Sequence, residues 1–177
     1  MGIGGQQLTI VVDVANVMGS RPDGWWRDRA GAAVRLHAEI VRLARSGRAT
    51  LPASPAPDGP HPASPAPDEA APDSPAPDGP RPAPGFVMVL EGAARAAAAR
   101  LAATEPDVDA GRTGPVRPGE VRVVQARGSG DDTIVAVVRE LPGRRVVVTA
   151  DRELRARCVA AGAEILGPGW LLGLLRG

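Results

Sequence analysis

Acidic residues follow three apolar, strand-like runs of this chain. They are Asp13, the neighbouring pair Asp131 and Asp132, and Asp151. In an open α/β sheet the carboxyl ends of parallel strands converge on one crevice, so we expect these four carboxylates to lie close together. Carboxylate oxygens are the ligands that hard cations such as Mg²⁺ prefer. The pattern therefore predicts metal-dependent chemistry on a phosphate ester.

Each acid also fits an ordinary role in local structure. Asp13 and Asn16, three residues later, are of types common in turns and helix caps. The other three aspartates stand at the starts of predicted helices, where the helix dipole favours acids. Their joint placement at the ends of different strands is what favours a shared site. Asn16, at the same strand tip as Asp13, is predicted to hold that carboxylate or a water molecule.

The elements that must position these acids alternate between strand and helix. Short apolar runs rich in β-branched residues predict strands at 8–12, 86–90, 121–125, 145–149 and 163–166. Apolar stripes and cap residues predict helices at 25–46, 92–103, 131–141, 151–161 and 170–175. The alternation predicts an α/β fold, namely a three-layer α/β/α sandwich with a mostly parallel, Rossmann-like sheet.

Residues 51–85 differ from the rest of the chain. They hold 13 of the 19 prolines and repeat Ser-Pro-Ala-Pro-Asp every ten residues, without large apolar residues that would let the repeats stack. We expect a disordered insertion within a single domain made of residues 1–50 and 86–177. Its PxxP spacing is compatible with an SH3-like protein partner, although composition alone accounts for that spacing.

The net charge of +1 hides an uneven distribution. The segment 51–85 carries a charge of −4, whereas the remainder has 20 Arg against 15 acids and so carries +5. Such an excess permits a nucleic-acid partner without requiring one.

Cys158 is the single cysteine, which excludes an intrachain disulfide and favours a reducing compartment. The chain also lacks an apolar run long enough to span a bilayer. We therefore expect a cytoplasmic protein without a membrane partner, and homo-oligomerisation remains open.

Three motifs, taken together and in this order, resemble the NYN branch of PIN-like ribonucleases, especially its YacP-like bacterial members. They are Asp13-x-x-Asn16, Gly130-Asp131-Asp132, and Val-Val-Val-Thr-Ala-Asp151-Arg-Glu-Leu with the Ala-Gly-Ala that follows it. The likeness covers nearly all of the chain outside 51–85. It implies a compact α/β/α sandwich in which Asp13, Asp131, Asp132 and Asp151 bind Mg²⁺ or Mn²⁺ and hydrolyse RNA phosphodiesters.

By position, the resemblance further implies Asn16 as a supporting polar residue and Glu91 as an additional metal-binding acid. The long Pro-rich insertion and the scarcity of aromatic residues depart from the family pattern. Trp25 and Trp26, near the edge of the expected site, are candidates for contacting a base, although packing against the sheet is favoured.

Neither of the two histidines lies near a motif, so general-base catalysis would fall to a metal-bound water or to an aspartate. Arg127 and Arg152, beside the acidic motifs, are candidates for holding phosphate, although each also fits a solvated surface position.

Three functions are compatible with these residues. The first is a metal-dependent ribonuclease, which the acids and the resemblance favour. The second is a metal-dependent hydrolase of nucleotides or other small phosphates, although the chain contains no Gly-x-x-x-x-Gly-Lys phosphate loop. The third is a non-catalytic RNA-binding or adaptor protein on the same fold.

Overall fold

The computed structural model of the chain describes residues 7–52, 82–104 and 114–177. The chain divides into two units, and the larger one joins Met1–Ala49 with Pro82–Gly177. The smaller unit, Thr50–Arg81, lies almost entirely outside the described residues. The disordered insertion expected at 51–85 therefore stays a prediction.

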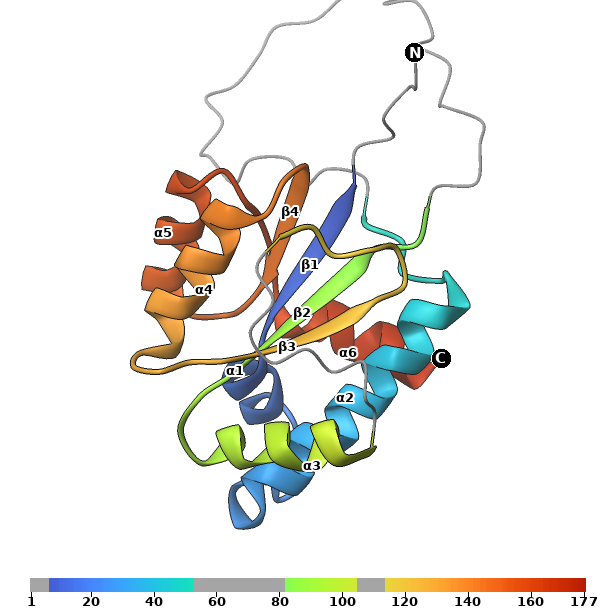
Figure 1. Cartoon of the computed structure of the whole chain (residues 1–177), viewed down its shortest axis with the longest axis vertical. Helices are drawn as coiled ribbons and strands as arrows, with labels where there is room; N and C mark the ends of the chain where they lie inside the picture. The colour runs from blue at the N-terminus through green and yellow to red at the C-terminus, as the bar shows by residue number, and fades with distance from the viewer. Residues whose placement is uncertain (1–6, 53–81, 105–113) are drawn as a thin grey trace, which may run out of the picture. The chain divides into compact units, whose positions relative to one another are not determined.

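The larger unit is built on one parallel sheet with the strand order β3-β2-β1-β4-β5 (Figure 1). The strands are β1 (Leu8–Asp13), β2 (Gly85–Leu90), β3 (Val121–Gln125), β4 (Arg144–Val148) and β5 (Glu164–Leu166). The central strands are rich in apolar residues and are buried over most of their length because helices cover both faces of the sheet.

Helices form a layer on each side of the sheet. They are α1 (Val14–Gly19), α2 (Arg29–Ser46), α3 (Ala96–Thr104), α4 (Gly130–Glu140), α5 (Arg152–Ala160) and α6 (Pro168–Arg176). Helices α4 and α5 pack together on one face, whereas α2 contacts α1, α3 and α6 on the other (Figure 1). The predicted three-layer α/β/α fold is thus confirmed. Within the described ranges, every helix is too short or too polar to cross a bilayer.

The layer formed by α4 and α5 is held to the sheet by a continuous apolar core. Val11 of β1, Ile134 of α4 and Leu154 of α5 belong to this core and are almost fully buried. Burying such a side chain contributes roughly 1.5–3 kcal/mol. Cys158 is buried in the same cluster, where burial raises the pKa of its thiol to about 11. It is therefore a packing residue.

The strand order creates a switch point between β1 and β4. The chain leaves β1 towards β2 and β3 on one side and then crosses to β4 and β5 on the other. Open α/β sheets bind ligands in the crevice outside the carboxyl ends of strands at such a point. Here β1 ends at Asp13, and β4 ends at Val148 immediately before Thr149.

The predicted helix at 25–46 is two elements. A single 3₁₀ turn, η1 (Trp25–Arg27), precedes α2, and Asp28 separates them. The Asp28 carboxylate accepts a 2.8 Å hydrogen bond from the backbone N–H of Gly31, which satisfies one of the unpaired donors at the start of α2. Another 3₁₀ turn, η2 (Gly92–Arg95), precedes α3, and the short helix α1 directly follows β1.

Candidate active site

A cavity of about 460 Å³ opens at the carboxyl ends of the central strands, at the switch point of the sheet. Four carboxylates line it, and they come from four separate segments of the chain. Its lining residues are Asp13, Ala15, Asn16, Gly19, Ser20, Glu91, Asp131 and Asp151. The structure thus brings together three of the four predicted aspartates, with Glu91 and Asn16. No arginine of the described residues belongs to the lining.

Asp13 is the most buried of these acids, with only 8% of its surface exposed. One carboxylate oxygen accepts a 3.1 Å hydrogen bond from the backbone N–H of Asn16, and the other accepts a 2.9 Å bond from the Thr149 hydroxyl. Burial raises the pKa of Asp13, the charges of Glu91 and Asp131 raise it further, and the two hydrogen bonds oppose this shift. Burial outweighs the hydrogen bonds, so the charged carboxylate is destabilised relative to solvent.

Thr149 connects the tips of β1 and β4. Its side chain is fully buried, and its hydroxyl donates to Asp13 while accepting a 3.1 Å hydrogen bond from the backbone N–H of Asp151. The Asn16 side-chain oxygen accepts a 3.0 Å bond from the backbone N–H of Ala150. Sequence reasoning missed Thr149. The available signal was a hydroxyl residue between a buried strand and an acid.

Glu91 holds the start of α4 in place. Its Oε2 accepts a 3.0 Å hydrogen bond from the backbone N–H of Gly130, the first residue of that helix. A Cβ at Gly130 would lie only 2.1 Å from Glu91 Oε2, so the carboxylate occupies the space that any other residue would fill. Glycine at this position therefore serves the placement of an acid, which sequence analysis did not predict.

Asp131 and Asp132 are neighbours in sequence, but only Asp131 lines the cavity. Burial raises the pKa of Asp131, and the charges of Asp151 and Glu91 act in the same direction. Asp132 is 70% exposed at its side chain and pairs with Arg157 of α5. Consecutive helical residues point roughly 100° apart, which explains the separation.

Asp151 is exposed and caps α5, since its carboxylate accepts a 2.8 Å hydrogen bond from the backbone N–H of Leu154. Asp13 and Asp151 are the N-cap residues of α1 and α5, and Asp131 lies in the first turn of α4, so three helices begin beside the cavity. The positive ends of their dipoles offset part of the carboxylate charge. Asp131 differs from the other three acids because it accepts no hydrogen bond from another residue of the described ranges.

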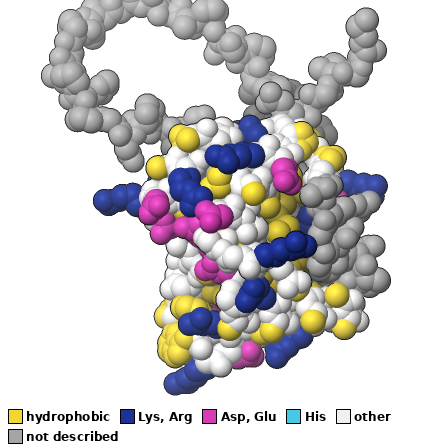
Figure 2. Space-filling view, turned by 60° about the vertical axis from the view of Figure 1, so that its left-hand side comes forward, with side chains coloured by type: hydrophobic (Ala, Val, Ile, Leu, Met, Phe, Trp, Pro, Cys, Tyr) yellow, Lys and Arg dark blue, Asp and Glu magenta, His cyan; other side chains and the backbone are white. Residues whose placement is uncertain are grey.

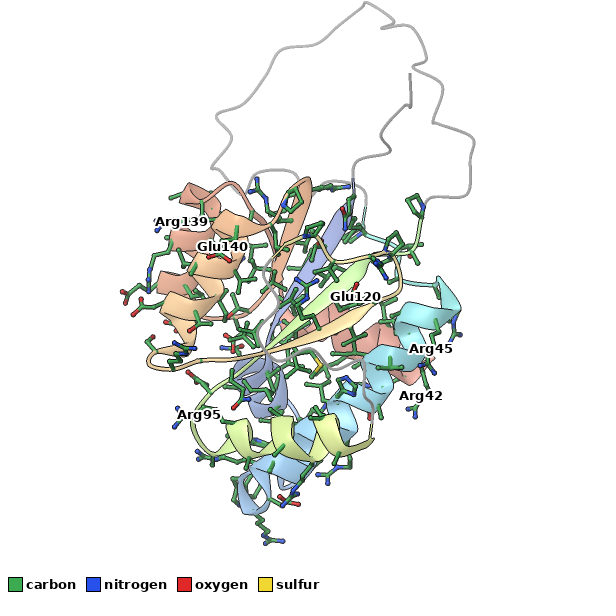
Figure 3. All side chains as sticks on the ribbon, in the orientation of Figure 1. Arg42, Arg45, Arg95, Glu120, Arg139 and Glu140 are labelled. Carbon is green, nitrogen blue, oxygen red and sulfur yellow. The ribbon has the colours of Figure 1, made fainter. Side chains whose placement is uncertain are left out.

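The two arginines predicted to hold phosphate, Arg127 and Arg152, are exposed and do not line the cavity. On the face that carries α4 and α5, acidic side chains gather in one area and basic ones surround it (Figure 2). Arg139 and Glu140 lie at the far end of α4, away from the carboxyl end of β1 (Figure 3). The arginines of the described residues therefore lie outside the cavity lining.

The side chains of the lining suit a hard divalent cation, because the carboxylates and Asn16 supply only oxygen and amide groups. Within the described residues, no three His, Cys, Asp or Glu side chains are grouped closely enough to hold one metal ion. Mg²⁺ commonly retains several waters and binds proteins through one or two carboxylates together with substrate phosphates. The cavity fits this open kind of binding and does not fit a closed protein cage.

Comparison of the chain with protein-family models, with curated proteins and with solved structures returned no match.

Proposed function

We propose that this protein is a metal-dependent ribonuclease that hydrolyses RNA phosphodiesters at the acidic cavity. The observation that carries the proposal is the convergence of Asp13, Glu91, Asp131 and Asp151 on one cavity, to whose lining the described part of the chain contributes no basic residue. Four carboxylates alone would repel a phosphate group. A bound cation removes that repulsion, so the cavity chemistry favours a site that takes cation and phosphate together.

The +5 charge of the chain outside 51–85 supports a polyanionic substrate, because a net positive body attracts nucleic acid over long range. The resemblance of the acidic motifs to the NYN branch of PIN-like ribonucleases gives RNA as the polymer and Mg²⁺ or Mn²⁺ as the cofactor. The free, buried Cys158 supports a cytoplasmic location as part of the same proposal.

The hydrogen bonds suggest different roles for the four acids. Asp13, Glu91 and Asp151 are each fixed by hydrogen bonds, so one or two of them would hold a cation at a defined position, with water completing its coordination. When bound, Mg²⁺ or Mn²⁺ would supply polarisation of the phosphodiester, activation of water and charge compensation at the leaving oxygen. Asp131 has no such hydrogen bond and a raised pKa, so its carboxylate suits acceptance of a proton from the attacking water.

The direct test is cleavage of an end-labelled single-stranded RNA by the full chain, with Mg²⁺, with Mn²⁺ and with a chelator. We expect products only with metal, and a rate at least about 100-fold lower for Asp131→Asn. Asp131 is partly exposed, so this variant is expected to fold. Equal cleavage rates for the parent and the variant, or RNA that stays intact with both metals, would rule out the ribonuclease proposal.

The same assay separates the two alternatives. Release of phosphate from nucleotides while RNA stays intact would indicate a small-phosphate hydrolase. RNA binding that persists in chelator, without any cleavage, would indicate a non-catalytic binding protein.

A further inference from the structure

Trp26 of η1 has 56% of its surface exposed, and Trp25 is only partly buried. The expectation that both indoles pack against the sheet is therefore wrong for Trp26. Asp28 ends the 3₁₀ turn before α2 begins, which leaves these indoles outside the sheet-packing face of the helix. A single exposed apolar side chain needs no explanation by itself. The residues around Trp26 give its exposure a functional interpretation.

Trp25, Trp26 and Arg29 form an ordered arrangement, which we call the indole shelf. The two indole rings meet edge to face, with centroids 6.3 Å apart and planes at 87°. The Arg29 guanidinium carbon lies 5.4 Å from the centroid of Trp25, within the range of a cation–π interaction. The backbone N–H of Trp25 also donates a 3.2 Å hydrogen bond to Asp23. The shelf is thus held by several contacts while Trp26 remains open to solvent.

The indole shelf borders the acidic cavity. Gly19, at the end of α1, lines the cavity, and a Cβ on Gly19 would lie 3.8 Å from Cζ2 of Trp25. The aromatic surface therefore begins where the cavity lining ends.

The charge beside the indole shelf is also suited to a nucleic-acid strand. Arg27 and Arg29 are exposed and form no ion pair with another described residue. By contrast, the Arg21 guanidinium is neutralised by Glu39. Two available guanidinium groups next to exposed indoles can contact phosphates on either side of a stacked base.

We propose that the indole shelf binds an unpaired nucleobase of the strand whose phosphodiester enters the acidic cavity. This inference rests on the proposed function and narrows its substrate to single-stranded RNA, or to an unpaired loop or end. Aromatic side chains stack on bases only when the base faces are free, and bases inside a duplex are already stacked. The shelf would thus select for unpaired segments without reading a particular sequence.

The test measures binding separately from cleavage. In an Asp131→Asn background with Mg²⁺, a fluorescently labelled eight-nucleotide oligouridylate is titrated with the full chain and followed by anisotropy. We expect Trp26→Ala to weaken binding about 10- to 100-fold, and Trp26→Phe to retain most of the affinity. Trp170→Phe, which changes a tryptophan on α6, is the matched control and should bind like the parent.

A blunt RNA duplex provides the second measurement. Single strands should quench tryptophan emission, whereas the duplex should leave the emission unchanged and should bind equally well to Trp26→Ala and to the parent. Equal single-strand affinity for Trp26→Ala and the parent, or equal quenching by the duplex, would overturn the shelf. Thermal melting of each variant checks folding, and Trp26→Phe keeps the test valid if the alanine variant unfolds.

Failure of this inference is distinguishable from failure of the ribonuclease proposal. If RNA binding depends on Trp26 but the chain with Asp131 intact does not cleave RNA, the base-binding role of the indole shelf is retained and the ribonuclease proposal is rejected. If RNA is cleaved in a metal-dependent way but Trp26→Ala binds RNA like its parent, the ribonuclease proposal is retained and the base-binding role of the indole shelf is rejected.

Discussion

The Thr149 hydroxyl donates a 2.9 Å hydrogen bond to Oδ2 of Asp13, although 136 residues separate the two in sequence. The same hydroxyl accepts the backbone N–H of Asp151. One buried side chain therefore sets the relative positions of two acids from neighbouring strands. This makes Thr149 a positioning residue for the cavity.

Thr149→Val tests that role. Valine has nearly the same shape but leaves Oδ2 of Asp13 without its donor and the Asp151 N–H without an acceptor, which costs ~1–3 kcal/mol of unfolding free energy. Chemical denaturation measures this loss. If Thr149 positions the acids, Mn²⁺ affinity falls as well, and Thr149→Ser restores both. Restored stability without restored metal affinity in the serine variant would contradict a positioning role.

Asp131 and Asp132 offer a matched pair of substitutions on adjacent residues. Asp131→Asn removes a carboxylate from the cavity and should lower kcat at least about 100-fold. Asp132→Asn removes an exposed carboxylate paired with Arg157, so kcat should stay within about threefold of the parent, as for other surface changes. Kinetics on single-stranded RNA measures both. Equal losses in the two variants would show that the cavity does not distinguish these acids.

Gly130→Ala tests the placement of Glu91. Its new Cβ would collide with the Glu91 carboxylate, and a flexible side chain can move away at a modest cost in stability. We expect the variant to fold, with a change of unfolding free energy within about 1–3 kcal/mol, but to lose metal affinity to the same extent as Glu91→Gln.

Gly128→Ala is the control for Gly130→Ala, because a Cβ at Gly128 meets nothing within 4 Å. It should bind metal like the parent. Normal metal binding by Gly130→Ala would mean that Glu91 takes no part in the site.

The pH dependence of stability follows from the raised pKa values of Asp13 and Asp131. In the metal-free protein, folding disfavours the charged forms of both carboxyl groups. The contribution of the protonated forms to stability is therefore fully present below about pH 3.8 and is lost as the pH rises through the pKa values of the folded state. Asp131→Asn removes the part of this loss of stability that comes from the Asp131 carboxylate. It should raise the unfolding free energy at pH 7 by about 0.5–2 kcal/mol and bring no gain near pH 3.5.

Thermal melting across pH measures this difference, since about 1 kcal/mol corresponds to ~2–4 °C for a chain of this size. Asp132→Asn, outside the cavity, should not show the gain at pH 7. A variant Asp131→Asn that melts below the parent at pH 7 without metal would contradict the described repulsion among the acids.

Much of the fold could be predicted because the sheet follows from local composition. Continuous β-branched runs such as those of β1 and β4 predict strands buried on both faces, and their alternation with helices predicts parallel pairing. The convergence of Asp13, Asp131 and Asp151 on one edge follows from that topology.

The features that could not be predicted depend on side-chain direction and on contacts distant in sequence. The local sequence does not indicate which of two consecutive acids at the start of a helix faces the cavity. Asp131 and Asp132 are therefore equally good candidate site residues from the sequence alone. The contact between Glu91 and Gly130 and the exposure of Trp26 arise only when separate segments come together. The break before α2 depends on Asp28, which caps the helix. Aspartate is a common residue type and often has other roles, so its presence alone does not predict a helix cap at this position.

The acidic cavity is expected to bind a divalent cation. Crystals of the full chain soaked in Mn²⁺ and measured near the manganese absorption edge test it most directly. We expect an anomalous peak inside the cavity, beside the carboxylates of Asp13, Glu91 or Asp151, which weakens in Glu91→Gln. Manganese bound only elsewhere, or a cavity that stays without a peak at millimolar Mn²⁺, would contradict it.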